Sequence, residues 1–219
     1  MLKHAIFQAI LERGMVAIVR ADTADAALQL AEACIAGGMD ALEIAFTTPD
    51  TLDVIKLLRQ RHGDQVLLGA GTVLDPETAR LAILAGAKFI ISPNVNVDTI
   101  RLCQRYQVLA MPGAMTPTEI ITALEAGADI IKIFPAEAVD PGYLKALRAP
   151  LPQAPLMPTG GVTLDNLPQW FENGAVAVGI GGSLTAPAAT GDYGAVSSRA
   201  RAFVARMAGV RQAPCANGT

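Results

Sequence analysis

Two charged residues stand inside apolar runs of this 219-residue chain. Lys132 lies within residues 130–134, and Glu43 lies within residues 41–46. Such runs predict buried strands, where a charged group is costly unless the protein uses it. Burial disfavours the charged form of an amine, and an uncharged amine is a nucleophile towards a carbonyl carbon. The pair therefore predicts Schiff-base chemistry, with Lys132 as the nucleophile and Glu43 as the general acid and base.

Each of these residues also has a plainer interpretation. The Lys132 ammonium could extend to a partner at the strand end. Glu43 could form a structural ion pair with Lys132 or Arg20. Because side chains alternate along a strand, Glu43 shares a face with Ala41 and Ala45, opposite the larger residues. This alternation predicts that the carboxylate points to the inside of the sheet, where it needs a partner.

Short apolar runs alternate with longer amphipathic segments along nearly the whole chain. The runs predict eight strands, at residues 16–20, 41–46, 66–70, 89–92, 108–112, 130–134, 156–159 and 176–179. The segments predict helices at residues 24–36, 51–61, 76–84, 97–106, 117–125, 142–147, 164–171 and 193–207. This alternation favours an α/β fold, the closed (β/α)8 TIM barrel, as a single domain. An open doubly wound sheet is the alternative, but the first strand lacks the glycine-rich turn typical of it.

In such barrels the functional residues follow the carboxyl ends of the strands. We expect four residues at these positions to bind the carboxylate and keto group of a substrate: Arg20, Thr72, Pro93 and Thr159. Arg20 is a candidate clamp for a carboxylate, and a salt bridge at the barrel mouth is the alternative. Thr72 can donate a hydrogen bond to a substrate oxygen or act as a local helix cap.

Glycines follow the seventh and eighth strands. Gly160 and Gly161 come directly after the seventh predicted strand, and Gly182 and Ser183 lie just beyond the eighth. Barrels often bind phosphate in these two loops through backbone N–H groups, and glycine lets the backbone approach an anion closely. Glycine pairs are also ordinary turn residues, but two at the expected positions favour a phosphate site.

The composition narrows the class of protein. With 52% hydrophobic and 17% charged residues, the chain suits one domain, which we place at residues 1–211, followed by a polar tail at 212–219. A net charge of −3 without a basic stripe argues against nucleic acid, and no run has transmembrane length. Three separated cysteines and no metal-ligand spacing predict reduced thiols, a cytoplasmic location and no metal.

The motifs together resemble a known family, the class I 2-keto-3-deoxy-6-phosphogluconate (KDPG) and 4-hydroxy-2-oxoglutarate (KHG) aldolases. The two most specific segments are Lys132 to Pro135, read as Lys-x-Phe-Pro, and Pro158 to Gly161, read as Pro-Thr-Gly-Gly. The matching segments run in order over nearly the whole chain, at residues 41–44, 69–74, 91–93, 111–113, 131–137, 158–162 and 179–183.

The resemblance implies a role for several residues. It makes Lys132 the imine-forming lysine, Glu43 the general base and Thr72 the contact to the pyruvate carboxylate. It also implies four phosphate contacts: Gly160, Gly161, Gly182 and Ser183. The substrate would be a small phosphorylated keto acid, and the resemblance further implies a homotrimer with neither metal nor organic cofactor.

The choice of substrate depends on a few positions. Some family members carry an arginine where Thr47 stands, so we expect Arg20 to hold the substrate carboxylate instead. A sister group acts on the galactonate epimer, and Thr159, Ala136 and Glu137 differ from its usual residues. We therefore expect cleavage of KDPG to pyruvate and glyceraldehyde 3-phosphate, with KHG cleavage to pyruvate and glyoxylate as a further activity. The galactonate aldolase, a phosphosugar isomerase and a non-catalytic phosphometabolite-binding barrel are the alternatives.

Overall fold

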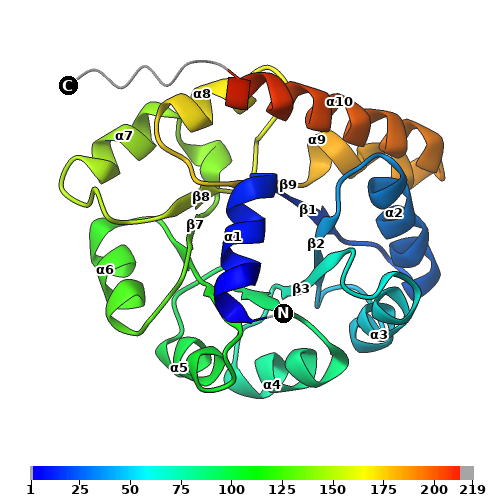
Figure 1. The fold of residues 1–219 in the computed structure, drawn as a ribbon, viewed down its shortest axis with the longest axis horizontal. Helices are drawn as coiled ribbons and strands as arrows, with labels where there is room; N and C mark the ends of the chain where they lie inside the picture. Colours follow the sequence, from blue (N-terminus) through cyan, green and yellow to red (C-terminus); the bar gives the residue numbers. More distant parts are fainter. Residues whose placement is uncertain (1, 213–219) are drawn as a thin grey trace.

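A ring of parallel strands inside a ring of helices makes up the computed structural model, which describes residues 2–212 (Figure 1). The strands are β1 (Met15–Val19), β2 (Ala41–Ala45), β3 (Leu67–Gly71), β4 (Phe89–Ile91), β5 (Leu109–Met111), β6 (Gly113–Ala114), β7 (Ile131–Ile133), β8 (Leu156–Pro158) and β9 (Val178–Ile180). The longer helices are α1 (Lys3–Arg13), α2 (Ala24–Ala36), α3 (Thr51–His62), α4 (Pro76–Ala85), α5 (Val97–Arg105), α6 (Pro117–Glu125), α7 (Gly142–Arg148), α8 (Leu167–Glu172) and α10 (Tyr193–Gln212). Short helical turns complete the chain: η1 (Ala136–Ala138), α9 (Gly182–Thr185) and η2 (Ala186–Thr190).

The strands close into a barrel. One sheet has the order β5-β4-β3-β2-β1-β9, and the other has the order β6-β7-β8. β5 and β6 are two parts of one barrel strand on either side of Pro112, whose carbonyl accepts a hydrogen bond of 2.9 Å from the Lys132 N–H. A parallel bridge between Thr159 and Gly179 joins β8 to β9. The predicted (β/α)8 barrel is therefore confirmed, and the open sheet is excluded.

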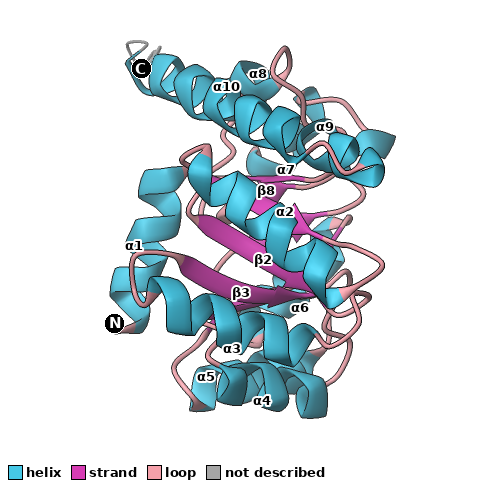
Figure 2. Cartoon of the chain, turned by 90° about the vertical axis from the view of Figure 1, so that its right-hand side faces the viewer, coloured by secondary structure: helices cyan, strands magenta, loops and turns pink. Residues whose placement is uncertain are grey.

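Apolar side chains fill the barrel interior at the end where the strands begin. Val16, Leu67 and Phe89 belong to this interior cluster, and all are buried. Helix α1 adds Ile6 and Ile10, which are 2% and 0% exposed. Figure 2 shows α1 standing at the end where the strands begin, and Figure 1 shows it crossing in front of them. Ile6 and Ile10 are the fully buried residues of α1, and the sequence pattern gave no prediction of a helix here.

A second apolar layer lies between the strands and the outer helices. It contains the outward-facing residues of β2 and β7, such as Leu42, Ile44 and Ile131. Cys34 on α2 and Cys103 on α5 also belong to it, and burial raises the pKa of each thiol to about 12. Both are free, buried cysteines that act as packing residues, which agrees with the reduced thiols expected from the sequence.

Helix starts follow their sequence signals. The Asp75 side chain accepts a hydrogen bond of 2.6 Å from the Thr78 N–H at the start of α4, which holds the pKa of that carboxyl below its usual range. At the start of α6, Thr116 and Glu119 form a reciprocal capping box. These caps fix where each helix begins after its strand.

Further predictions from the sequence concern membrane spans, the cellular location and the C-terminal tail. No helix among residues 2–212 is long and apolar enough to cross a bilayer. The cytoplasmic location is not tested by this finding and stays a prediction. Of the predicted tail at 212–219, Gln212 is the last residue of α10, and residues 213–219 lie outside the described residues.

Candidate active site

Lys132 and Glu43 meet inside the barrel. Lys132 comes from β7 and Glu43 from β2, and the Lys132 Nζ lies 3.8 Å from the Glu43 Oε1. Their side chains are only 6% and 2% exposed. Since the flanking Ile131 and Ile133 pack outward, strand alternation turns Lys132 inward. The barrel therefore brings a potential nucleophile and a carboxylate to one point, although their residues are 89 positions apart in the sequence.

The Glu43 carboxylate occupies space that a neighbouring glycine leaves free. A Cβ on Gly71 of β3 would lie 1.8 Å from the Glu43 Oε1, so no larger residue fits there without moving the carboxylate. The other oxygen, Oε2, is buried and has no hydrogen-bond partner among the residues that the structure describes. A buried carboxylate oxygen without a partner is costly, which is a common property of groups that serve a substrate.

Arg20 and Thr72 lie together at the mouth. Arg20 follows β1, Thr72 follows β3, and an Arg20 Nη2 donates to the Thr72 Oγ1 across 3.5 Å, the long limit for such a bond. Arg20 is exposed, so its guanidinium is free to reach a ligand. Thr72 has a φ of 58°, a left-handed conformation that is uncommon for a β-branched residue. Backbone strain of this kind often accompanies function.

Pro93 and Thr159 line other parts of the same end. The loop after β4 presses against β6, because a Cβ on Gly113 would lie 2.3 Å from the Pro93 carbonyl oxygen. The Thr159 side chain is 1% exposed and lies over Gly179, whose Cβ would come within 2.4 Å of the Thr159 Oγ1. That hydroxyl has only a long bond of 3.5 Å to the Met157 carbonyl. It is therefore poorly satisfied and suited to a better acceptor.

The two glycine-containing loops are neighbours. Gly160 and Gly161 have φ angles of 98° and 67°, which favour glycine. The Ser183 hydroxyl donates to the Val162 carbonyl across 2.5 Å, which ties the loop after β9 to the loop after β8. The structure thus brings together the four predicted phosphate contacts in adjacent loops.

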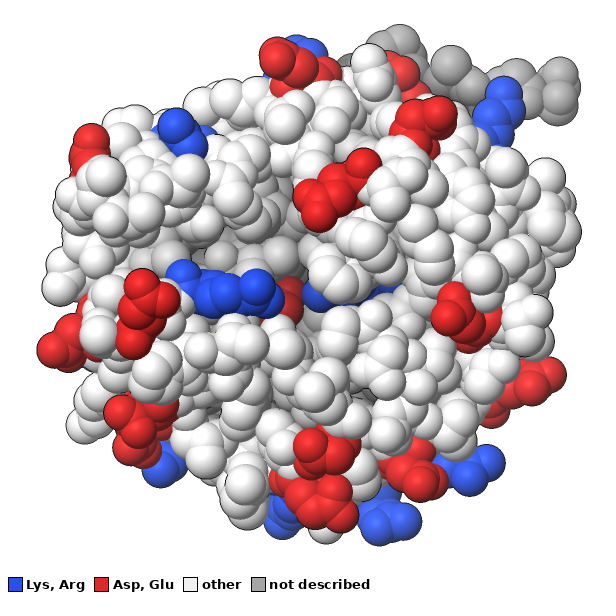
Figure 3. All heavy atoms as spheres, turned by 180° about the vertical axis from the view of Figure 1, so that it is seen from behind, with Lys and Arg blue, Asp and Glu red and all other residues white. Residues whose placement is uncertain are grey.

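The face on which the strands end is shown in Figure 3. Its centre is hollowed, with Lys and Arg side chains on both sides of the hollow and an acidic group between them. Charge of both signs at the bottom of one hollow suits a ligand that carries carboxylate and carbonyl groups.

Phe134 is a residue of this site that belongs to the Lys-x-Phe-Pro segment but received no functional role from the sequence. Its ring centroid lies 4.7 Å from the Lys132 Nζ. It is 36% exposed, at the mouth. Strand alternation gives the signal that would have found it, since residue 134 shares a face with residue 132.

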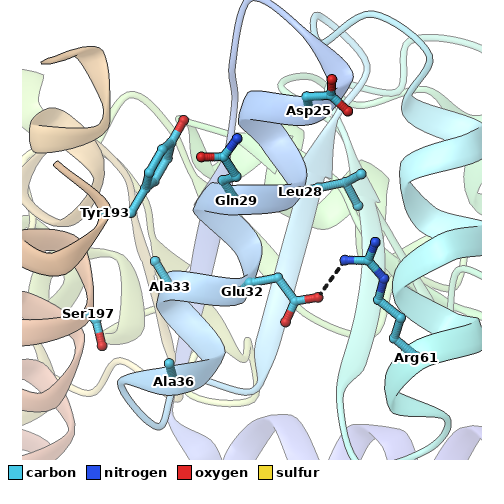
Figure 4. Close-up of a pocket in the computed structure, with 9 residues that line it drawn as sticks. All are labelled: Asp25, Leu28, Gln29, Glu32, Ala33, Ala36, Arg61, Tyr193 and Ser197. Carbon is cyan, nitrogen blue, oxygen red and sulfur yellow. Dashed lines mark hydrogen bonds and ion pairs between the residues drawn. The ribbon is translucent and has the colours of Figure 1, made fainter. Parts of the chain in front are cut away.

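A groove of about 520 Å³ lies elsewhere, on the outside of the barrel where α2 meets α3 and α10 (Figure 4). Figure 4 shows the Glu32 carboxylate directed towards Arg61, and their oxygen and nitrogen lie 3.0 Å apart. Glu32 also contacts His62 at 2.9 Å. Glu32 is thus satisfied by its basic neighbours, and none of the predicted site residues lines the groove.

The fold and the buried lysine–carboxylate pair define a class of enzyme, the carbon–carbon lyases that work on keto acids. The family model for KDPG and KHG aldolase matches residues 6–198. The chain belongs to the KDPG and KHG aldolase family, as its motifs predict, and is an aldolase.

Individual relatives agree with this assignment. The chain is 42% identical over 171 residues to the 2-dehydro-3-deoxy-6-phosphogalactonate aldolase of Escherichia coli, covering 78% of this chain and 83% of that protein. It is 37% identical over 197 residues to the 2-dehydro-3-deoxy-phosphogluconate aldolase of Treponema pallidum, covering 88% and 93%. A crystal structure of KDPG aldolase from Legionella pneumophila, with pyruvate captured as a covalent carbinolamine, superposes with a TM-score of 0.78 at 28% identity, covering 92% and 98%.

Proposed function

We propose that this protein is a class I aldolase that cleaves KDPG to pyruvate and glyceraldehyde 3-phosphate through an imine on Lys132. The observation that carries the proposal is the Lys132 amine held 3.8 Å from the Glu43 carboxylate in a nearly closed interior. A desolvated lysine beside an acid–base group is the arrangement that imine chemistry needs. The Legionella relative, in which pyruvate is held as a carbinolamine, supports the same chemistry for this chain.

The mechanism follows from the two side chains. The Lys132 lone pair attacks the C2 ketone, and Glu43 transfers the protons that form the carbinolamine and release water. The protonated imine then draws electrons from the C3–C4 bond as Glu43 removes the C4 hydroxyl proton. Glyceraldehyde 3-phosphate leaves, the enamine takes a proton at C3, and hydrolysis releases pyruvate and the free amine.

The remaining predicted residues bind the substrate in this proposal. Arg20 and Thr72 hold the carboxylate, which gives Arg20 the task that an arginine at position 47 has in other members. Pro93 shapes the wall, and the Thr159 hydroxyl contacts the sugar-acid chain. Four residues supply phosphate contacts through the loops after β8 and β9: Gly160, Gly161, Gly182 and Ser183. Binding energy from the phosphate orients the reacting carbons.

Borohydride trapping with pyruvate tests the proposed chemistry. The expected result is a stable pyruvyl adduct on Lys132, located by peptide mass spectrometry, together with release of pyruvate from KDPG. Lys132→Arg is the matched variant, because it keeps a long side chain with nitrogen groups at this position and cannot form the imine. A site that does not form an imine would give no adduct, and that outcome would contradict the proposed class I mechanism.

The galactonate epimer is the second candidate substrate. It is favoured by the 42% identity to the galactonate aldolase of Escherichia coli, whereas Thr159 favours the gluconate form. We expect Thr159→Val to shift the ratio of kcat/KM for the two epimers by about tenfold, the effect of one hydrogen bond. Rates on KDPG, its epimer and unphosphorylated KHG, measured side by side, decide which substrate the site prefers. A ratio that Thr159→Val leaves unchanged would contradict the role given to this hydroxyl.

We also propose that the protein assembles as a homotrimer. Leucines on and near α4 are exposed to an unusual degree, and Leu74, Leu81 and Leu84 are 54%, 50% and 65% exposed. A surface of this kind often marks an interface. Light scattering should give three times the chain mass of 22.8 kDa. A monomer at micromolar concentration would contradict this assembly.

A further inference from the structure

Phe134 lies directly after β7 with the face of its ring over the amine of Lys132. The ring centroid is 4.7 Å from the Lys132 Nζ. The Phe134 backbone N–H donates to the Ala114 carbonyl across 3.3 Å, which anchors the residue beside β6. Strand alternation then directs residues 132 and 134 to the same side. The contact is thus fixed by the strand itself.

The surroundings of the amine offer few other groups that favour a positive charge. The Lys132 side chain is only 6% exposed, so water solvates the nitrogen poorly. Glu43 approaches from β2 at 3.8 Å, beyond hydrogen-bond distance. The negative face of an aromatic ring attracts a cation within about 6 Å, and more strongly where water is excluded. The ring is therefore the second group, after Glu43, that can stabilise a cation at this nitrogen.

We infer that Phe134 is a further catalytic residue, whose ring face stabilises the positive charge that the Lys132 nitrogen carries in the protonated imine. The inference rests on the proposed function. In the step concerned, the amine lone pair forms the bond to C2, and the carbonyl oxygen is protonated to a hydroxyl. That hydroxyl takes another proton and leaves as water while the nitrogen lone pair forms the C=N bond. The nitrogen keeps one hydrogen and a positive charge, and one proton is consumed overall.

Fluorination of the ring separates this electrostatic role from a steric one. Each fluorine withdraws electron density from the ring face with little change in volume, and the partly exposed Phe134 has room for it. The experiment replaces Phe134 with 4-fluoro-, 3,5-difluoro- and 3,4,5-trifluorophenylalanine. The rate at which a reagent acylates the Lys132 amine is first measured against pH, to find a pH at which the free amine is uncharged. Pyruvate is then titrated at that pH. Borohydride trapping at each concentration then gives the pyruvate concentration at half-saturation.

The expected result is a stepwise rise of that concentration, by about threefold to tenfold across the series. The same fluorinated residues at Phe89, which fills the opposite end of the barrel interior, should leave the half-saturating pyruvate concentration unchanged. Phe134→Leu, which keeps an apolar side chain and removes the ring, should weaken imine formation at least as much as the trifluoro variant. If the half-saturating pyruvate concentration does not change with fluorination of Phe134, or rises equally with fluorination of Phe134 and of Phe89, the inference is overturned. The aldolase mechanism would remain intact. Absence of an adduct in the unmodified protein would instead overturn the proposed function.

Discussion

The two ends of the barrel are built from the same strands and carry opposite kinds of side chain. Where the strands begin, the interior is closed by apolar residues, including Ile10 from α1 and Phe89 from β4. Where they end, the interior holds Lys132 and Glu43 and opens into a hollow. The comparison indicates that one end supplies stability and the other supplies chemistry, a division known for barrels of this kind. Four substitutions test this division.

The largest effect should follow from removing the amine. Lys132→Ala is expected to abolish aldol cleavage, because it removes the amine that forms the imine in the proposed mechanism. Lys88→Ala, at the start of β4 on the opposite end, is the matched control and should retain wild-type kcat. Coupled assays for pyruvate release measure both. Cleavage by the Lys132→Ala variant at the wild-type rate would refute the proposed mechanism.

The next largest effect should be on stability. Ile10→Ala removes a side chain that is 0% exposed at the closed end of the barrel. It should lower the free energy of unfolding by about 3 kcal/mol, through lost burial and the cavity left behind. Urea denaturation measures this loss, and kcat of the folded variant should stay near the wild-type value. A large fall in kcat would show that the two ends are not separate.

Removing the acid–base group should have a smaller effect than removing the amine. Glu43→Gln keeps the shape of the side chain and is expected to slow cleavage by roughly 10²-fold. Because the Glu43 Oε2 is buried without a hydrogen-bond partner among residues 2–212, replacing the carboxylate with an amide should leave the variant at least as stable as the wild type. Single-turnover rates with KDPG and thermal unfolding measure the two quantities. A structural ion pair would instead give lost stability with unchanged turnover.

The smallest effect should come from a polar residue at the catalytic end that has no chemical task. Asp75→Ala removes the N-cap of α4 and should cost about 1 kcal/mol, whereas Asp75→Asn should retain most of this. Since the folded-state pKa of Asp75 is lowered, its stabilisation is present above the unfolded pKa and is lost as pH falls through the folded pKa. Unfolding curves for wild type and Asp75→Ala should therefore approach each other in acid, by about the part of the stabilisation that Asp75→Asn loses. A difference that does not shrink as the pH falls to about 2 would contradict the charge-dependent part of the cap.

Much of the fold and of the site could be predicted from the sequence, because both depend on local patterns. The eight apolar runs predicted the strands of the barrel, although Pro112 divides the fifth into β5 and β6. Alternation in β2 predicted that Glu43 turns inward, and the structure confirms it. The final helix was predicted too short, since α10 continues to Gln212.

Other features depend on groups far apart in the chain. Helix α1 packs across the barrel through the buried Ile6 and Ile10, with Phe7 and Ala9 partly buried against the same cluster. The room for the Glu43 carboxylate comes from Gly71, on a different strand. Phe134 was missed because an aromatic residue in an apolar run is, by pattern alone, a core residue. Its ring is distinguished only by the amine beneath it.

The sequence by itself determined the strand and helix order and the presence of a lysine and a glutamate in buried strands. It also determined the glycines after the last two strands, since hydrophobic periodicity and backbone freedom are local properties. Only the tertiary structure decided that β2 and β7 face each other across a closed barrel, so that the two charged side chains lie 3.8 Å apart. The physical reason is that closure of the sheet sets distances between strands, and no local preference along the chain encodes them.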